Sequence, residues 1–132
     1  MQKVLIIDDN PADSRLLADN IKERNAAVQI KVLNNSTDAR NEFVDFTPDL
    51  TFIDISMPEK DGFQLLEELN SLPQRADNLI IVLSGYSDVG TLDMAMKLGA
   101  DNYFVKPRTL DGYRKLAENI SELDHLKEFI AL

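Results

Sequence analysis

Residues 3–10 read KVLIIDDN, in which a lysine and four apolar residues run directly into two aspartates. A short apolar run of this kind is typical of a buried strand. Residues 12–25 follow, with Leu16, Leu17 and Ile21 at the spacing of one helix face. The stretch therefore predicts a strand that ends in acidic residues and passes into a helix.

The same unit recurs along the chain. Further strands are predicted at residues 28–33, 50–53, 79–83 and 102–105. The intervening helices are expected at residues 37–46 with a Ser36 or Thr37 cap, after Pro58 and Gly62, before Gly99, and from about residue 109 onward. Five strands that alternate with five helices imply right-handed crossovers onto one sheet. We therefore expect an α/β fold, a doubly wound five-stranded parallel sheet with helices on both faces.

Composition narrows the class of protein. A chain of 132 residues with 44% hydrophobic residues fits one globular domain. Neither a signal peptide nor a membrane-spanning run is apparent, so we expect a cytoplasmic protein. The net charge of -9 argues against direct nucleic-acid binding and against an anionic membrane surface. With no cysteine and only His125 as histidine, any metal must be bound through oxygen.

Polar residues follow four of the five predicted strands. Asp8 and Asp9 follow the first strand, Asp54 the third, Ser84 the fourth and Lys106 the fifth. Open α/β sheets bind ligands outside the carboxyl ends of their strands. Residues from almost the whole length of the chain are therefore expected to converge on one edge of the sheet.

Three carboxylates at one edge would repel one another unless a hard cation lay between them, and Mg²⁺ with its oxygen ligands suits them. Lys106 offers a positive charge and Ser84 a hydroxyl, which are the groups that hold a phosphoryl group in transfer. Asp54, alone at its strand end, is the best nucleophile. Taken singly, each of these residues has an ordinary reading as a cap, a turn residue or a solvated charge. The joint arrangement favours the chemical reading.

The chain resembles the response-regulator receiver family of two-component signalling over nearly its whole length. The stretches that carry the resemblance are LIIDDN at residues 5–10, FIDISMPEKDG at 52–62, VLSGYSD at 82–88 and LGADNYFVKP at 98–107. The resemblance implies the strand order 2-1-3-4-5. It also implies that Asp9 and Asp54 bind Mg²⁺ directly, with Mn²⁺ as a possible substitute, that Asp8 helps through water, and that the carbonyl of Ser56 completes the ligands.

By the same resemblance, Asp54 is expected to become an aspartyl phosphate that Ser84 and Lys106 contact. Tyr103 would be the switch aromatic that turns inward as Ser84 moves. The Lys106-Pro107 bond is expected to be cis. Ser56 and Tyr86 flank the approach of water and would tune hydrolysis.

The resemblance also implies partners and a boundary. The phosphoryl group would come from a histidine kinase or a phosphotransfer protein, and the chain would catalyse only its own phosphorylation and dephosphorylation. A partner protein or a missing effector domain would take the output. Residues 1–124 are expected to form the receiver, and residues 125–132 an extension of the last helix that serves as a linker or a dimerisation segment. Its apolar residues suggest a short coiled-coil seam at Tyr113, Leu116, Ile120, Leu123 and Ile130.

Three other classes of protein agree less well with the sequence. A phosphatase of the haloacid dehalogenase type needs a second acid two residues after its nucleophile, where this chain has Ser56. A flavodoxin-like protein needs a phosphate-cradling first loop, and the acidic DDNPADS would repel that ligand. A receiver that is never phosphorylated would not need the full set of residues from Asp8 to Lys106.

Overall fold

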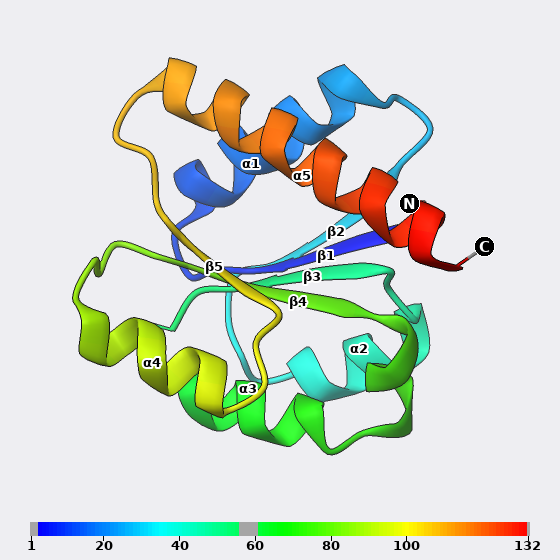
Figure 1. Ribbon diagram of the computed structural model, residues 1–132, viewed down its shortest axis with the longest axis vertical. Coiled ribbons are helices and arrows are strands. Elements are labelled where there is room, and N and C mark those ends of the chain that lie inside the picture. Colours follow the sequence, from blue (N-terminus) through cyan, green and yellow to red (C-terminus); the bar gives the residue numbers. More distant parts are fainter. Residues whose placement is uncertain (1–2, 56–60, 132) are drawn as a thin grey trace.

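The computed structural model describes residues 3–55 and 61–131, with side chains up to Ile120. Within these ranges strands and α-helices alternate along the chain (Figure 1). The elements are β1 (Lys3–Ile7), α1 (Pro11–Arg24), β2 (Gln29–Leu33), α2 (Ala39–Phe46), β3 (Leu50–Ile53), α3 (Gly62–Asn70), a 3-10 helix (Pro73–Asp77), β4 (Leu79–Ser84), α4 (Val89–Lys97), β5 (Asn102–Val105) and α5 (Leu110–Ala131).

The strands form one parallel sheet in the order β2-β1-β3-β4-β5. This confirms the predicted fold class and strand order. Ile7 pairs with Ile53, and Ile53 pairs with Val82. Neighbouring strands therefore end almost level with one another, and the residues that follow them meet at one edge of the sheet.

Each face of the sheet has its own core, because successive side chains of a strand point to opposite faces. Helices α1 and α5 cover one face, and α2, α3 and α4 cover the other (Figure 1). The α1/α5 core contains Val4, Ile6, Leu17, Ile21, Phe52, Leu83, Tyr113, Leu116 and Ile120. The opposite core contains Leu5, Ile7, Phe43, Ile53, Leu65, Leu66, Leu69, Ile80 and Val82. Nearly every residue of β1, β3 and β4 is thereby buried.

The ends of the helices follow local chemistry. Helix α1 begins at Pro11, which has no N–H to leave unpaired, and the side chain of Asn10 accepts hydrogen bonds from the next turn. Helix α2 begins at Ala39, slightly later than predicted, and Asp38 at its cap position makes no side-chain capping bond. The 3-10 helix at Pro73–Asp77 was not predicted, since so short a turn has no apolar periodicity.

The prediction of a cis bond between Lys106 and Pro107 is wrong, because the described residues contain no cis peptide bond. The two isomers of an X-Pro bond differ by only about 0.5–1 kcal/mol, so the surrounding structure and not the sequence selects between them. Here the Lys106 amide donates to the Ser84 carbonyl at 2.7 Å and extends the β4/β5 ladder with a trans bond beyond it.

The last helix continues without a break through Ala131. The seam predicted to begin with Tyr113, Leu116 and Ile120 is wrong for these three residues, because all are buried in the core of this chain. The side chains of residues 121–132 lie outside the described part, so the boundary at residue 124 and the role of residues 125–132 stay predictions. Within the described ranges, no helix combines the length and the apolar character that a membrane span requires.

Gly62 allows α3 to begin directly against the end of β3. A Cβ atom at this position would lie 2.3 Å from the Ile55 Cα and 2.6 Å from the Asp54 carbonyl oxygen. Both of these atoms belong to the backbone, which cannot rotate away as a flexible side chain could. The Gly62 N–H also donates to the Ile55 carbonyl at 3.2 Å. A residue without a side chain thus holds the strand end that carries Asp54.

We predict that Gly62→Ala lowers the free energy of unfolding by about 1–3 kcal/mol, because the added methyl group must push two backbone segments apart. Urea unfolding followed by circular dichroism measures this loss. Gly85→Ala is the control, since a Cβ there meets nothing within 4 Å, and its effect should stay within about 0.5 kcal/mol. Equal stability of Gly62→Ala and the unaltered chain would contradict the packing argument.

Candidate functional site

The site residues are fixed by backbone hydrogen bonds that continue the sheet just past the strand ends. In each case the amide that follows one strand donates to a carbonyl at the end of its neighbour. These bonds join Asp8 to Leu33 at 3.0 Å, Asp54 to Ile7 at 2.9 Å and Lys106 to Ser84 at 2.7 Å. The backbone therefore sets the position of these residues before their side chains interact.

The Lys106 ammonium lies among three carboxylates. Its Nζ atom is 2.9 Å from Asp8 Oδ2, 3.0 Å from Asp13 Oδ2 and 3.1 Å from Asp54 Oδ2. An ammonium has three N–H groups, and each of these carboxylates can accept one. The side chains of Lys106, Asp8 and Asp54 are almost fully shielded from water. One positive charge thus faces three negative charges in a poorly solvated space.

Burial and charge act in opposite directions on Lys106. Burial alone would lower the pKa of Lys106, but the hydrogen bonds and negative charges of Asp8, Asp13 and Asp54 outweigh it and hold that pKa above its ordinary range. For Asp8 the balance is reversed. Burial raises the pKa of Asp8 to about 6, although the Asn10 amide and Lys106 both favour the charged form. Among the described residues, the carboxylates of the site carry more negative charge than the Lys106 ammonium can neutralise.

The carboxylates also meet the requirements of a hard cation. Ligand oxygens of Asp8, Asp9 and Asp54 all lie within 4.8 Å of one another. Asp8 and Asp54 are buried, whereas Asp9 is exposed. A set of ligands made of carboxylate oxygens fits Mg²⁺ better than a soft metal. The predicted ligand Ser56 lies outside the described residues.

Two residues that the sequence reading missed support this site. Asn34, just after β2, donates its side-chain amide to the Asp8 carbonyl at 2.9 Å and to the Ser14 hydroxyl at 3.2 Å. It ties the first loop to the start of α1. Asp13 contributes a carboxylate from the first turn of α1. In the sequence Asp13 lies in the acidic stretch DDNPADS, and nothing in that stretch indicates that one of its acids reaches Lys106.

Ser84, Tyr86 and Tyr103 form a connected chain on the other side of the site. The buried Ser84 hydroxyl accepts a hydrogen bond from the Tyr86 amide at 3.2 Å. The Tyr103 hydroxyl donates to the Tyr86 carbonyl. Burial raises the pKa of Tyr103 above its ordinary value. Any movement of Ser84 must therefore disturb the loop segment that holds Tyr103.

The comparisons with known proteins agree with this geometry. The model of the response regulator receiver domain matches residues 4–118. The chain belongs to this family, whose members act in two-component signalling, where they accept phosphoryl groups and interact with histidine kinases and output domains.

Among curated relatives, the chain is 30% identical over 130 residues to regulatory protein AtoC of Escherichia coli, covering 98% of this chain and 27% of that protein. It is 37% identical over 122 residues to protein-glutamate methylesterase/protein-glutamine glutaminase 2 of Vibrio vulnificus, covering 86% of this chain and 34% of that protein. The chain therefore spans about a third or less of these two relatives.

Solved structures support the fold. The signal receiver domain of a DNA binding response regulator from Colwellia psychrerythraea has a TM-score of 0.83 and 25% identity, covering 95% of this chain and 99% of that one. The Mn(2+)-bound form of response regulator Rcp1 has a TM-score of 0.80 and 23% identity, covering 91% of each chain.

We predict a pH dependence of stability in the metal-free protein that comes from Asp8. The folded pKa of about 6 lies above the ordinary value of 3.8, so the folded state holds more protons between these values. The free energy of unfolding contributed by Asp8 is therefore fully present below pH 4 and is lost as the pH rises to about 6. Urea unfolding across this range in the presence of a chelator measures it.

The comparison is with Asp8→Asn, which removes the titrating group and should flatten this part of the curve. Asp19→Asn is the control, since Asp19 is an exposed acid on the same face of the chain's first helix as Arg15. It should keep the slope of the unaltered protein. Parallel curves for Asp8→Asn and the unaltered protein would show that Asp8 does not titrate in this range.

Proposed function

We propose that this chain is a phosphorylation-switched receiver in which Asp54 accepts a phosphoryl group in a magnesium-dependent reaction. The observation that carries the proposal is the meeting of the buried Asp54 carboxylate with Asp8, Asp9 and the Lys106 ammonium. The donor would be a histidine kinase or a phosphotransfer protein, as for the family in general.

The residues divide the chemistry among them. A carboxylate oxygen of Asp54 would attack the phosphorus as the bond to the donor breaks. Asp8, Asp9 and Asp54 would hold magnesium, with the carbonyl of Ser56 as a further proposed ligand. The bound cation would offset the negative charge of the carboxylates and of the phosphoryl oxygens. We propose no reaction on another substrate, because the transferred phosphoryl group would stay bound to Asp54.

Lys106 and Ser84 would hold the transferred group. The phosphoryl group brings about 1.5 to 2 negative charges at neutral pH, and Lys106 is the buried cation beside Asp54. Ser84, the last residue of the adjacent strand β4, would contact the phosphoryl group as well. Because Ser84 is linked through the Tyr86 backbone to Tyr103, its movement would change the position of that aromatic ring. Tyr86 would also limit the access of water to the phosphoryl group.

The face formed by α4, β5 and the start of α5 is the proposed output surface. It carries exposed apolar side chains that a partner could cover: Val89, Leu92, Met96, Val105 and Leu110. A clean switch from 1:99 to 99:1 between resting and active states requires about 5.5 kcal/mol of differential stabilisation. Residues 125–132 would continue the last helix toward an output module or a second chain.

We predict that incubation with magnesium and acetyl phosphate adds one acid-stable, base-labile phosphoryl group to this chain. The acceptor should be Asp54, since its carboxylate is the buried acid beside Lys106. Intact-mass spectrometry counts the groups. Asp54→Asn should remain unlabelled, and Asp49→Asn, an acid at the opposite end of the same strand, should be labelled like the unaltered protein. Full labelling of Asp54→Asn would reject the assignment.

Magnesium binding should distinguish the roles of Asp9 and Lys106. We predict that Asp9→Ala abolishes binding, because it removes one carboxylate ligand of the site. Lys106→Ala should bind magnesium at least as tightly as the unaltered protein, since its ammonium competes for the same carboxylates. Titration followed by NMR measures both affinities.

The same Lys106→Ala sample should lose the shift of Tyr103 signals that beryllofluoride with magnesium causes in the unaltered protein. Lys97→Ala is the control, because Lys97 is an exposed lysine at the end of α4, and it should match the unaltered protein in both measurements. Magnesium affinity unchanged in Asp9→Ala would count against the metal site.

A further inference from the structure

Asp13 is an acid beside the proposed phosphorylation site to which the proposed function gives no role. Its Oδ2 atom lies 3.0 Å from the Lys106 Nζ atom, and its side chain is 29% exposed. It belongs to the first turn of α1, whereas Asp8 and Asp54 follow strands of the sheet. Among the described residues, the oxygens that could hold one cation belong to Asp8, Asp9 and Asp54. Asp13 therefore contacts the lysine from outside this group of ligands.

The position of Asp13 is fixed by the backbone at the start of α1. Its amide donates to the Asn10 side chain at 3.2 Å. The amide of the next residue, Ser14, donates to the Asn10 carbonyl at 3.1 Å, and the buried Ser14 hydroxyl accepts from the Asn34 side chain at 3.2 Å. Asp13 thus presents its carboxylate from a well-held turn. The flexible member of the Asp13-Lys106 pair is the lysine side chain.

The Lys106 ammonium occupies oxygens that the proposed metal site requires. Its Nζ atom lies 2.9 Å from Asp8 Oδ2 and 3.1 Å from Asp54 Oδ2, and both carboxylates belong to the candidate metal group. The ammonium must give up these contacts when the two carboxylates bind a cation. Because the Lys106 side chain is only 14% exposed, loss of its partners is costly unless another anion holds it. Among the described carboxylates outside the metal group, Asp13 is the one that already contacts Lys106.

We propose that Asp13 is a positioning residue that keeps hold of the Lys106 ammonium when the carboxylates of Asp8 and Asp54 turn to a divalent cation. Asp13 thereby favours binding of the cation, because the lysine retains an anionic partner. It opposes the next step, because a phosphoryl group must compete with Asp13 for the same ammonium. This inference rests on the proposed function of Asp54 and Lys106, but its first half concerns the cation alone.

The two effects of Asp13 on binding have opposite signs, which distinguishes this role from a structural one. If Asp13 only stabilised the first turn of α1, its loss would weaken the binding of both ligands. Loss of its charge should instead weaken magnesium binding and strengthen the binding of a phosphoryl analogue. Asp13→Asn is the suitable change, because the side chain keeps its size and one oxygen acceptor but loses its charge. An amide oxygen binds an ammonium less strongly than a carboxylate does.

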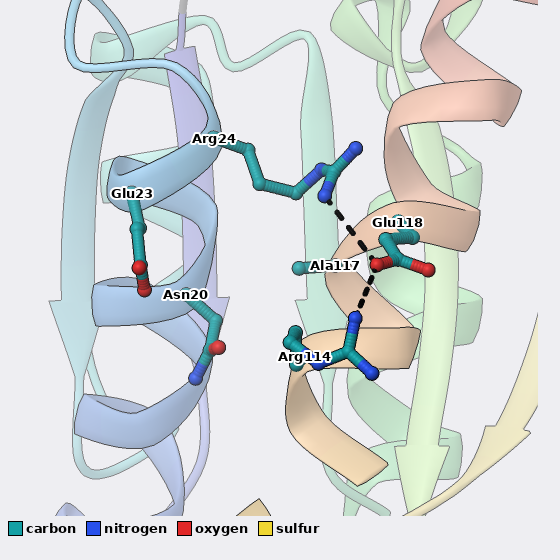
Figure 2. Close-up of a pocket in the computed structure, with 6 residues that line it drawn as sticks. All are labelled: Asn20, Glu23, Arg24, Arg114, Ala117 and Glu118. Atoms are coloured by element: carbon teal, nitrogen blue, oxygen red, sulfur yellow. Dashed lines mark hydrogen bonds and ion pairs between the residues drawn. The ribbon is translucent and has the colours of Figure 1, made fainter. Parts of the chain in front are cut away.

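A second acid between α1 and α5 provides a control for the loss of one negative charge. Arg24 and Arg114 both point toward Glu118, at 3.7 Å and 2.7 Å (Figure 2). They line a surface hollow of about 370 Å³ together with Asn20, Glu23 and Ala117. Glu118, like Asp13, is an acid held by basic side chains, but its partners here are arginines. Glu118→Gln therefore makes the same change in net charge without altering the Asp13-Lys106 pair.

The test uses the full chain and two titrations. In magnesium titrations without a phosphoryl analogue, Asp13→Asn should weaken the affinity about five-fold or more, in the range of a typical coupling between sites. In beryllofluoride titrations at saturating magnesium, the same variant should bind about five-fold more tightly. Glu118→Gln should match the unaltered protein in both titrations. Unchanged magnesium affinity in Asp13→Asn, or beryllofluoride binding that is not tightened, would overturn the proposal.

A double-mutant cycle tests whether Asp13 acts through Lys106. In a Lys106→Ala background there is no ammonium to hold, so Asp13→Asn should change the magnesium affinity by less than about two-fold, as for independent sites. Lys97→Ala removes an exposed lysine at the end of α4 and is the control background, in which the full loss should remain. An equal loss of magnesium affinity in the Lys106→Ala background would mean that Asp13 acts on the cation directly, and would overturn the positioning role.

Failure of the proposed function has a different signature, because it would appear as absent labelling of Asp54 and absent beryllofluoride binding in the unaltered chain. The magnesium titrations and the double-mutant cycle involve no phosphoryl group. They therefore still decide whether Asp13 holds the lysine when the metal site is filled. A magnesium affinity that Asp13→Asn leaves unchanged would overturn the inference even if Asp54 is labelled as proposed.

Discussion

In the part of the chain that the structure describes, carboxylates outnumber cations at the carboxyl edge of the sheet, and the rest of the structure depends on this imbalance. Lys106 faces Asp8, Asp13 and Asp54 at distances near 3 Å, and Asp9 adds a further, exposed carboxylate. Loss of one partner from a buried ionic group is costly, because it leaves an uncompensated charge. Lys106 is the one ammonium that the described residues place among these carboxylates, and their remaining negative charge favours the binding of a further cation. The same imbalance that makes the site costly to fold makes it ready for a metal ion and sensitive to a new anionic group.

Backbone hydrogen bonds and apolar packing, which take no part in the chemistry of the site, offset the free-energy cost of this charged edge. Level strand ends and the hydrogen bonds that continue past them place Asp8, Asp54 and Lys106 without help from their side chains. Two apolar cores, one on each face of the sheet, supply the stabilisation that the charged edge lacks. Gly62 then holds the end of β3 through the Ile55 carbonyl, and Asn34 ties the first loop to the start of α1. Rigid placement by the backbone is what allows like charges to be held so close together.

The sequence predicted the parts of this structure that depend on periodicity and on strand ends. Buried strands and the residues just after them are local features, so Asp8, Asp54, Ser84 and Lys106 could be assigned to one edge. Asp13 could not be assigned to the site, because its contact with Lys106 joins residues that lie 93 positions apart in the sequence. Tyr113 fitted a helical seam equally well until the structure placed it in the core. The Lys106-Pro107 isomer could not be predicted reliably either, since its two forms differ by so little energy.

Helix α5 runs without a break for 22 residues, from Leu110 to Ala131. The 18 residue steps from Tyr113 to Ala131 span about 27 Å at about 1.5 Å per step. If the helix tilted as a rigid body by about 5° about Tyr113, its far end would move by about 2.4 Å over that length. A change in helix orientation too small to alter the sheet would thus give a larger displacement at the far end of α5. The length of α5, as well as the chemistry near its first residues, therefore sets how far the end of the helix moves when the site changes.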